Sequence, residues 1–402
     1  PPRCSVALMF NARKRICHTD NTDVMNNEQR ILCLAARPQL SAQAERELLA
    51  RLRTQIDWEL LWQQGHLHEV LPLLATTLRR FGDTITIPAK WNTRAQRRLY
   101  ATLIRNTTLA DTMLEVLSAF TQAGIAGIPV KGIVLAETLY GGLGLRSLGD
   151  LDVLVHPTDL PVARAALAQL GFVQEADPGF DSEHHPFHDP PYYRPATGGS
   201  VCLELHWGLW ASRFFRAGTE TLWQRATTAQ IHGVVLPILS PEDTLLHLAI
   251  HRSRSALRLR FVCDIAALLE KHSATLDWNY VLEQAHTAGA RTALSLALAL
   301  ATELLDAPLP ATILPHLQIN PLKRRLLEYT CGVSALFRPT APSDLSQQPS
   351  LLLRLLEQDG AGHIAWNIGT TLVRKSRKQL YNASRKRQTQ AIVPPNTRQA
   401  PE

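Results

Sequence analysis

The sequence has no apolar run of the ~18 residues that a membrane-spanning helix requires. It also lacks a Walker loop, a Rossmann glycine fingerprint and a Gly-x-Ser-x-Gly nucleophile elbow. P-loop nucleotide hydrolysis, dinucleotide-dependent redox chemistry and α/β-hydrolase catalysis are therefore poorly supported. What remains is a chain of 402 residues with ordinary hydrophobic content, long enough for two or three domains.

Cysteine is scarce and unpatterned. None of the six cysteines has the spacing of a metal site or of a disulfide framework, and two lie inside strongly apolar segments. This pattern indicates small buried thiols in a reducing compartment, and we expect a cytoplasmic protein. The six are Cys4, Cys17, Cys33, Cys202, Cys263 and Cys331.

Acidic residues are absent between Asp359 and Glu402, which makes the end of the chain strongly basic. One short stretch there holds seven basic residues, enough to account for the net charge of +7: Arg374, Lys375, Arg377, Lys378, Arg385, Lys386 and Arg387. Composition therefore does not predict a nucleic-acid-binding body. We expect residues 358–402 to form a solvated, largely disordered tail. The alternative is contact with RNA or an anionic lipid surface.

The beginning of the chain also departs from the folded pattern. Residues 1–24 have no amphipathic period, and they lack the long apolar run of a signal peptide. A regular helical pattern begins at Met25. We therefore expect residues 1–24 to be a disordered leader or a mis-called translation start.

The hydrophobic periods predict helices towards both ends of the chain and strands between them. Residues 28–81 and 240–356 are expected to be mostly helical, and a long helix is expected from about Thr93 to Ala123. Asp57-Trp58 and Asp277-Trp278 open similar helical segments, each with aspartate as the N-cap.

The central part alternates short strands and helices. A helix is expected from Asp159 to Leu170, followed at 177–199 by a long polar loop or an irregular hairpin. Strands are predicted at 125–130, 150–155, 201–207 and 234–239, and a further strand is expected to start at Phe172 and Val173.

The most informative segment is the run Arg-Ser-Leu-Gly-Asp-Leu-Asp-Val-Leu-Val that ends at Val155. Asp150 and Asp152 are two residues apart in an apparent buried strand, so both carboxylates should point the same way. Burying two like charges is costly unless a cation lies between them. Mg²⁺ is the natural cation, because it binds one or two carboxylates together with substrate phosphates. The segment therefore predicts a phosphoryl-transfer centre.

A third acid lies in the alternating strand at 201–207. Glu204 is on the same face as His206, whereas Leu203 and Leu205 occupy the other face. An acid on a buried face needs a partner. The alternative is that Glu204 lies on a solvent-facing side of the strand.

An ordered set of motifs resembles a known family. Lys131-Gly132, Arg146, Asp150-Leu-Asp152 and Glu204-Leu-His206-Trp resemble the uncharacterised nucleotidyltransferase family of the DNA polymerase β-type superfamily. The likeness covers roughly residues 57–304. It extends to Tyr140, Leu-Gly-Phe at 170–172, Ser240-Pro-Glu-Asp at 240–243, Leu245, His247 and His251.

The resemblance implies an α+β fold with a polymerase-β-like nucleotidyltransferase core, a small mixed sheet with helices. This core is expected at residues 95–240. An N-terminal helical segment at 25–94 would precede it, and a helical domain at 241–357 would follow, with the nucleotide between the sheet and the C-terminal helices.

The resemblance also implies roles for individual residues. Asp150, Asp152 and Glu204 would bind metal, expected to be two Mg²⁺ ions or alternatively Mn²⁺, and Glu204 would also help to take the acceptor proton. The phosphates would lie at Lys131-Gly132, where related enzymes usually carry Gly-Ser or Gly-Gly at a helix start.

Two further residues have roles with alternatives. Arg146 is a candidate triphosphate clamp because of its guanidinium geometry, the alternative being a loop arginine that pairs with Asp150. His206 is expected to support the site or to face the nucleotide or the acceptor.

The implied function is Mg²⁺-dependent transfer of NMP from an NTP, most simply ATP, to an acceptor hydroxyl of a small molecule or peptide, with release of pyrophosphate. One alternative is a protein-nucleotidylating or antitoxin-type transferase. The other is a non-catalytic nucleotide-binding or scaffold protein with the same fold.

The remaining histidines form two groups. His184, His185 and His188 lie in the polar loop, where they and nearby acids offer a loop zinc site as a less favoured alternative. His247 and His251 are spaced i, i+4 on a predicted helix, but no metalloprotease glutamate follows His247. We expect this helix to pack on the catalytic domain or to contact the nucleotide base, with Asp264 as a helix acid near the two histidines.

Overall fold

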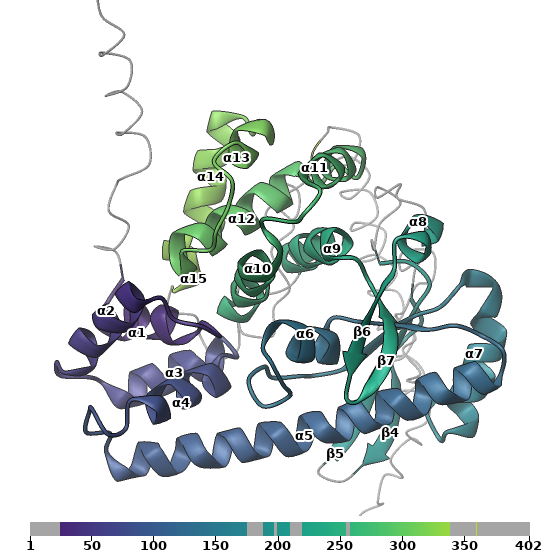
Figure 1. Cartoon of the computed structure of the whole chain (residues 1–402), viewed down its shortest axis with the longest axis horizontal. Helices are drawn as coiled ribbons and strands as arrows, with labels where there is room; N and C mark the ends of the chain where they lie inside the picture. The colour runs from purple at the N-terminus through teal and green to yellow at the C-terminus, as the bar shows by residue number, and fades with distance from the viewer. Residues whose placement is uncertain are drawn as a thin grey trace, which may run out of the picture.

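The computed structural model describes residues 25–174, 188–196, 199–209, 219–254, 258–337 and Asp359 (Figure 1). The expected leader, most of the polar loop with His184 and His185, the stretch 338–357 and the basic tail beyond Asp359 lie outside these residues.

The fold contains a five-stranded mixed sheet, in the order β1-β2-β5-β4-β3. The strands are β1 (Ile128–Val130), β2 (Leu151–Leu154), β3 (Val173–Gln174), β4 (Tyr192–Ala196) and β5 (Gly199–His206). The pair β2–β5 is parallel, whereas β1–β2, β3–β4 and β4–β5 are antiparallel. A separate antiparallel hairpin consists of β6 (Thr227–Ile231) and β7 (Val234–Ile238).

The two faces of the sheet have different chemistry. Side chains such as Val153 and Leu205 are fully buried in one core with Phe120 of helix α5 (Ala89–Gln122) and Leu167 of helix α7 (Leu160–Gln169). Residues that alternate with them carry the polar groups of the opposite face. Because one face is entirely apolar and covered by helices, the register of β2 and β5 is strongly specified. A 3₁₀ turn, Pro157–Asp159, leads into α7.

Helix α5 is the longest element and runs along the lower edge of Figure 1. It begins after Pro88, a few residues earlier than predicted, and it ends before Gly124, whose φ of +77° favours glycine. The predicted domain boundary between residues 94 and 95 therefore falls inside α5.

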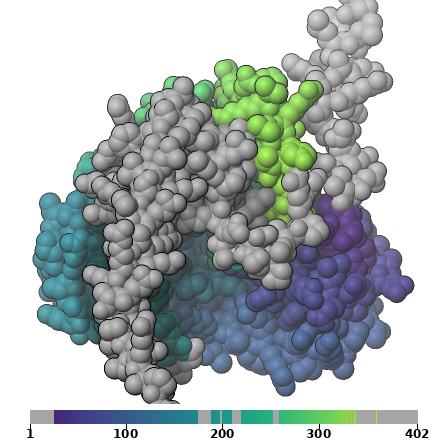
Figure 2. Space-filling model, turned by 180° about the vertical axis from the view of Figure 1, so that it is seen from behind, coloured from purple at the N-terminus to yellow at the C-terminus, as the bar shows by residue number. Residues whose placement is uncertain are grey.

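Four N-terminal helices precede α5: α1 (Asn27–Ala35), α2 (Ala42–Leu52), α3 (Trp58–Leu67) and α4 (Leu71–Arg80). Asn26 and Gln29 form a capping box at the start of α1. From behind, these helices (purple) and α5 (blue) make up one continuous lower part of the surface (Figure 2).

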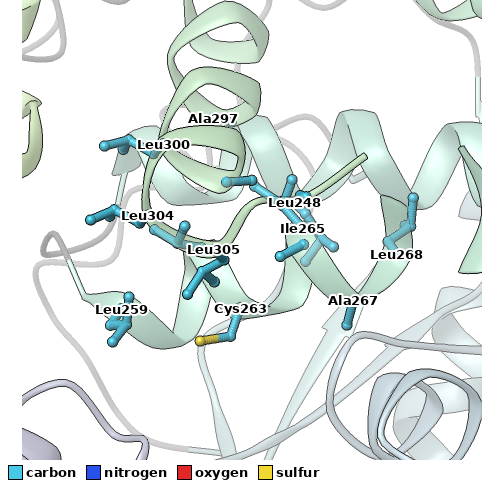
Figure 3. Close-up of a cluster of buried hydrophobic side chains, with 14 of the residues drawn as sticks. Leu248, Leu259, Cys263, Ile265, Ala267, Leu268, Ala297, Leu300, Leu304 and Leu305 are labelled. Carbon is cyan, nitrogen blue, oxygen red and sulfur yellow. The ribbon is translucent and has the colours of Figure 1, made fainter. Parts of the chain in front are cut away.

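The C-terminal part is helical, as predicted. Its helices are α9 (Pro241–Arg254), α10 (Leu259–His272), α11 (Trp278–Thr287), α12 (Arg291–Leu305), α13 (Ile313–His316), α14 (Pro321–Cys331) and α15 (Val333–Leu336), and α8 (Thr219–Gln224) lies earlier. Leucine and alanine side chains of α9, α10 and α12 interlock at their centre (Figure 3). Ser240 caps α9 as predicted, since its hydroxyl accepts from the Asp243 N–H at 3.1 Å.

The N-terminal and C-terminal helices share one continuous hydrophobic core. The buried Arg37 guanidinium links the two parts directly, because it donates to the Asp306 carboxylate at 2.8 Å and to the Leu304 carbonyl at 3.3 Å. The His68 ring also packs edge-on against Phe337, with centroids 5.0 Å apart. Helices from both ends of the described chain are therefore packed around the same interior.

The N-terminal and C-terminal helical parts share the same helix-capping arrangement. Asp57 caps α3 and Asp277 caps α11, as predicted, each accepting from a backbone N–H three residues on. The N–H of Asp57 donates to Glu28 in the first turn of α1, and the N–H of Asp277 donates to Glu242 in the first turn of α9. The predicted similarity between the segments that begin at Asp57 and Asp277 therefore includes a contact with an earlier helix, α1 in one case and α9 in the other.

The α+β fold is confirmed, but the strands were only partly predicted. β4 falls in the segment expected to be a loop or an irregular hairpin, where it pairs antiparallel with β5, and β6 was not predicted. No helix among the described residues is both long and apolar enough to cross a bilayer.

Candidate active site

Two carboxylates lie side by side on the polar face of the sheet. Asp152 is in register with Glu204 across the parallel pair β2–β5, and Leu154 is likewise in register with His206. Residues in register on adjacent strands point to the same face. The ligand atoms of Asp152, Glu204 and His206 all lie within 4.8 Å of one another. The sequence predicted this partnership for Glu204, and the structure brings it together.

Lys131 brings a positive charge into the same group. It follows β1, and its Nζ donates to Asp152 Oδ1 at 2.9 Å. The Asp152 side chain is only 2% exposed and that of Lys131 13% exposed. Such a shielded pair is stronger than one in water, provided that both charges remain paired. Lys131 was predicted to contact phosphate, and its contact with Asp152 was not foreseen.

His206 connects the two carboxylates. Its Nε2 lies 2.9 Å from Asp152 Oδ1 and 3.3 Å from Glu204 Oε2. Burial alone would lower the pKa of His206, but the hydrogen bonds to Asp152 and Glu204 raise it above its ordinary value. The imidazole therefore holds both carboxylates in place and favours its charged form.

Asp150 immediately precedes β2, which begins at Leu151, so the prediction that it lies within the strand is wrong by one residue. Its carboxylate lies outside the group of three ligand atoms. Repulsion by Asp152 and then burial raise the pKa of Asp150 to about 6, although Lys131 and Arg260 act in the opposite direction.

The charges of this site do not cancel. Burial by itself would raise the pKa of Asp152, but Lys131 and His206 hold it well below its ordinary value. Three carboxylates, those of Asp150, Asp152 and Glu204, thus face two cationic groups, Lys131 and a protonated His206. An additional cation would compensate the remaining negative charge, and two neighbouring carboxylates are donors that Mg²⁺ or Mn²⁺ prefers. The donor set fits a divalent cation.

The backbone at Lys131 is unusual. Lys131 has φ +54° and ψ −130°, the conformation of the first central residue of a type II′ turn, where glycine dominates. Gly132 also has a positive φ of +23°, and a Cβ there would lie 3.6 Å from the Asp150 carbonyl oxygen. A lysine held in this conformation costs of order 1–3 kcal/mol, which the surrounding contacts must offset.

This strain leads to a testable prediction. Lys131→Gly is expected to be more stable than Lys131→Ala by about 1 kcal/mol, because both variants lose the ion pair but only glycine adopts the backbone without strain. Urea denaturation measures the difference. Arg46, exposed in the middle of α2, is the control position. There the order should invert, with Arg46→Ala more stable than Arg46→Gly by about 1 kcal/mol. Equal stabilities of the two Lys131 variants would mean that the backbone is not strained.

Arg146 lies in a different environment from the predicted one. Its guanidinium is 6% exposed and makes a bidentate pair with the fully buried Asp264, at 2.8 Å for each bond. The Tyr140 hydroxyl donates to the same carboxylate at 2.8 Å, and Asn106 holds the Arg146 carbonyl at 2.7 Å. The alternative pairing of Arg146 with Asp150 is wrong, and Asp264 lies on a helix, as expected. Arg146 ties the loop before Asp150 to α10.

The α9 histidines lie on the side of the site that faces the C-terminal helices. His247 lines a small pocket together with Lys131, Val134 and Leu135. The His251 ring packs edge-on against Phe261, with centroids 5.5 Å apart. His247 therefore lies against the catalytic domain beside Lys131, a position that fits both expected roles, whereas His251 packs on α10.

The described end of the polar loop approaches the site. His188 forms an isolated bridge opposite His206, and the two rings are 5.3 Å apart. Asp189 is bound by Arg164 through two hydrogen bonds, at 2.7 and 2.8 Å, and by the Tyr192 hydroxyl. Since these bonds occupy the Asp189 carboxylate, it does not support the loop zinc alternative.

A mixed sheet with carboxylates on adjacent strands, and a helix that opens beside them at a glycine, is typical of a nucleotidyltransferase domain. The chain belongs to the uncharacterised nucleotidyltransferase family, whose model matches residues 54–306. No curated protein matches the chain.

Sequence reasoning missed Arg98 and Arg260, which lie next to the segment before Asp150. Arg98 Nη2 is 3.3 Å from the Ser147 hydroxyl, and Arg260 Nη1 is 3.3 Å from the Ser147 carbonyl. The only sequence signal was the Arg-Leu-Arg triplet that ends at Arg260, directly before an apolar helix.

Proposed function

We propose that this protein is a divalent-cation-dependent nucleotidyltransferase that moves NMP from an NTP, most simply ATP, to an acceptor hydroxyl of a small molecule or peptide and releases pyrophosphate. Membership of the family supports nucleotidyl transfer in general. The observation that carries the proposal is the register of Asp152 with Glu204 on one polar face, with Lys131 bonded to the same carboxylate.

Asp152 and Glu204 would hold the cation, with Asp150 as a further carboxylate at the edge of the site. A bound divalent cation would neutralise phosphate charge and make the acceptor oxygen more acidic. Glu204 is the more accessible of the two paired carboxylates, with a side chain 28% exposed against 2% for Asp152. Glu204 is therefore the group that an acceptor can reach, and it would take the acceptor proton. His206 would keep both carboxylates oriented.

Lys131 and Gly132 would hold the phosphates. The Lys131 ammonium is a point charge beside the carboxylates, and α6 (Gly132–Leu139) begins at the next residue. The first backbone N–H groups of a helix attract anions. The presence of all three carboxylates argues against a purely non-catalytic scaffold, because a scaffold does not need like charges held together.

The test is calorimetric titration of ATP into the full chain, with Mg²⁺ and then with EDTA. Wild-type protein is expected to bind ATP only with Mg²⁺, and the double variant Asp150→Ala/Asp152→Ala is expected to lose that binding because the cation has no site. The control is Asp83→Asn, which removes an exposed carboxylate in a turn far from the sheet in sequence. Absence of binding of any NTP with Mg²⁺ or Mn²⁺ would overturn the proposal. If binding is found, α-labelled ATP identifies the acceptor by label transfer.

A further inference from the structure

Two arginines pair with one carboxylate beside the candidate active site, and a third arginine lies in the same region. Arg258 and Arg260, at the start of α10, both pair with Glu69, with Arg260 Nε 2.9 Å from Oε2. Arg98, from α5, reaches the same region through Ser147. We call Arg98, Arg258 and Arg260 the arginine cluster.

Arg98 makes no ion pair among the described residues, unlike the other two members of the arginine cluster, which share Glu69. Arg146 is close by, but Asp264 neutralises it. Arg98 is instead hydrogen-bonded to the neutral Ser147 hydroxyl. Burying a cation without a matching anion is costly. The half-buried Arg98 guanidinium therefore indicates a place for an anion.

The hydrogen bonds of Arg98 and Arg260 also indicate a place for an anion. Among the described residues, the buried Nε of Arg98 has no hydrogen-bond partner. The remaining bonds of Arg98 and Arg260 to Ser147 are long, at 3.3 Å each, and they go to neutral oxygens. Guanidinium groups bind phosphate oxygens more strongly, through shorter, charge-assisted bonds. The Arg260 side chain is 20% exposed and that of Arg258 24% exposed, so solvent reaches the cluster.

The arginine cluster lies next to the segment that leads to Asp150 in the candidate active site. Ser147, which two of the arginines contact, is three residues before Asp150. The charge of Arg260 also acts directly on Asp150, as does that of Lys131. Asp150 is therefore within electrostatic reach of two separate cationic groups.

We propose that the arginine cluster is a phosphate-binding subsite of the active site, distinct from Lys131-Gly132. This inference rests on the proposed function and adds the groups that hold a second anionic part of the substrates. The chemistry common to its ligands is a phosphate group. Its source is either the terminal phosphates of the NTP or a phosphate carried by the acceptor.

The experiment uses calorimetry on the full chain with three probes: ATP with Mg²⁺, AMP with Mg²⁺, and inorganic pyrophosphate. The double variant Arg98→Gln/Arg260→Gln is expected to bind pyrophosphate more than about tenfold more weakly than wild type, since each lost charged hydrogen bond costs about that factor. The matched control is Arg97→Gln, the exposed arginine that directly precedes Arg98 in the same helix. It should change pyrophosphate binding less than about twofold, as is usual for a surface charge.

The probes distinguish the two sources. If the double variant loses affinity for ATP as well as pyrophosphate but not for AMP, the subsite holds the terminal phosphates of the NTP. If ATP binding is unchanged and pyrophosphate still binds to the wild type saturated with ATP, the subsite serves a phosphate on the acceptor. Unchanged binding of both ATP and pyrophosphate in the double variant overturns the inference.

Failure of this inference is separable from failure of the proposed function. Mg²⁺-dependent ATP binding that needs Asp152 but not the arginines keeps the function and removes the subsite. Should the glutamine variant not fold, Arg98→Lys/Arg260→Lys keeps the charge and removes the bidentate geometry. It is expected to weaken pyrophosphate binding several-fold, and wild-type affinity in this folded variant would also overturn the inference.

Discussion

Replacing Asp152 by asparagine is expected to weaken Mn²⁺ binding by more than about 100-fold, since loss of groups that merely orient a metal ligand already costs about 10–100-fold. Asparagine keeps the shape of the side chain but removes the charge that Lys131 and His206 both contact through Oδ1. Calorimetry or electron paramagnetic resonance with Mn²⁺ as the probe measures the effect.

Asp150→Asn is the matched comparison, because it removes the same charge two residues away. Asp150 lies outside the group formed by Asp152, Glu204 and His206. If Asp150→Asn lowers the number of bound ions from two to one, Asp150 holds the second ion that the sequence led us to expect. An unchanged number would assign the cation to Asp152 and Glu204. Wild-type Mn²⁺ affinity in Asp152→Asn would rule out this group as a cation site.

Asp264→Asn is expected to lower the free energy of unfolding by about 3–5 kcal/mol, the usual cost of breaking a buried ion pair by removing one partner. Asp264 is fully buried, and its carboxylate accepts from Tyr140 and twice from Arg146. The variant leaves the Arg146 guanidinium buried without a charge partner. Urea denaturation followed by circular dichroism measures the change.

The control for Asp264 is Glu45→Gln, which breaks the exposed pair with Arg80 and should cost no more than about 1 kcal/mol. Adding Arg146→Met to Asp264→Asn should recover part of the lost stability, because the unpaired charge is then gone. A double variant less stable than Asp264→Asn alone would show that Arg146 stabilises the loop through contacts other than the ion pair.

Sequence patterns correctly predicted the features that depend on local periodicity, namely strand faces and helix caps. The alternation of Leu203, Glu204, Leu205 and His206 placed Glu204 and His206 on one face, and the structure bears this out because strand register is fixed by the buried leucines. Helix ends at Ser240 and Asp277 were predicted equally well, because capping depends on residues within one turn.

Contacts between distant segments were not predictable in the same way. The partner of Arg146 is Asp264, which lies 118 residues later, and no pattern in the sequence relates the two. The Lys131–Asp152 bond depends on the antiparallel pairing of β1 with β2, which brings Val130 opposite Asp152. β6 was missed because its residues are mostly polar and exposed, so that no apolar alternation marks it.

The continuous core of the N-terminal and C-terminal helices has a practical consequence for shortened forms of the protein. The matched family range begins at residue 54, after α1 and α2. Yet Ile31, Leu32 and Leu48 from those two helices are fully buried in the same core as Leu304. A fragment cut at the family boundary would expose the apolar surface that these residues cover. A soluble fragment that unfolds cooperatively should therefore include α1 and α2. The limits of the family match are a poor guide to where this protein can be shortened.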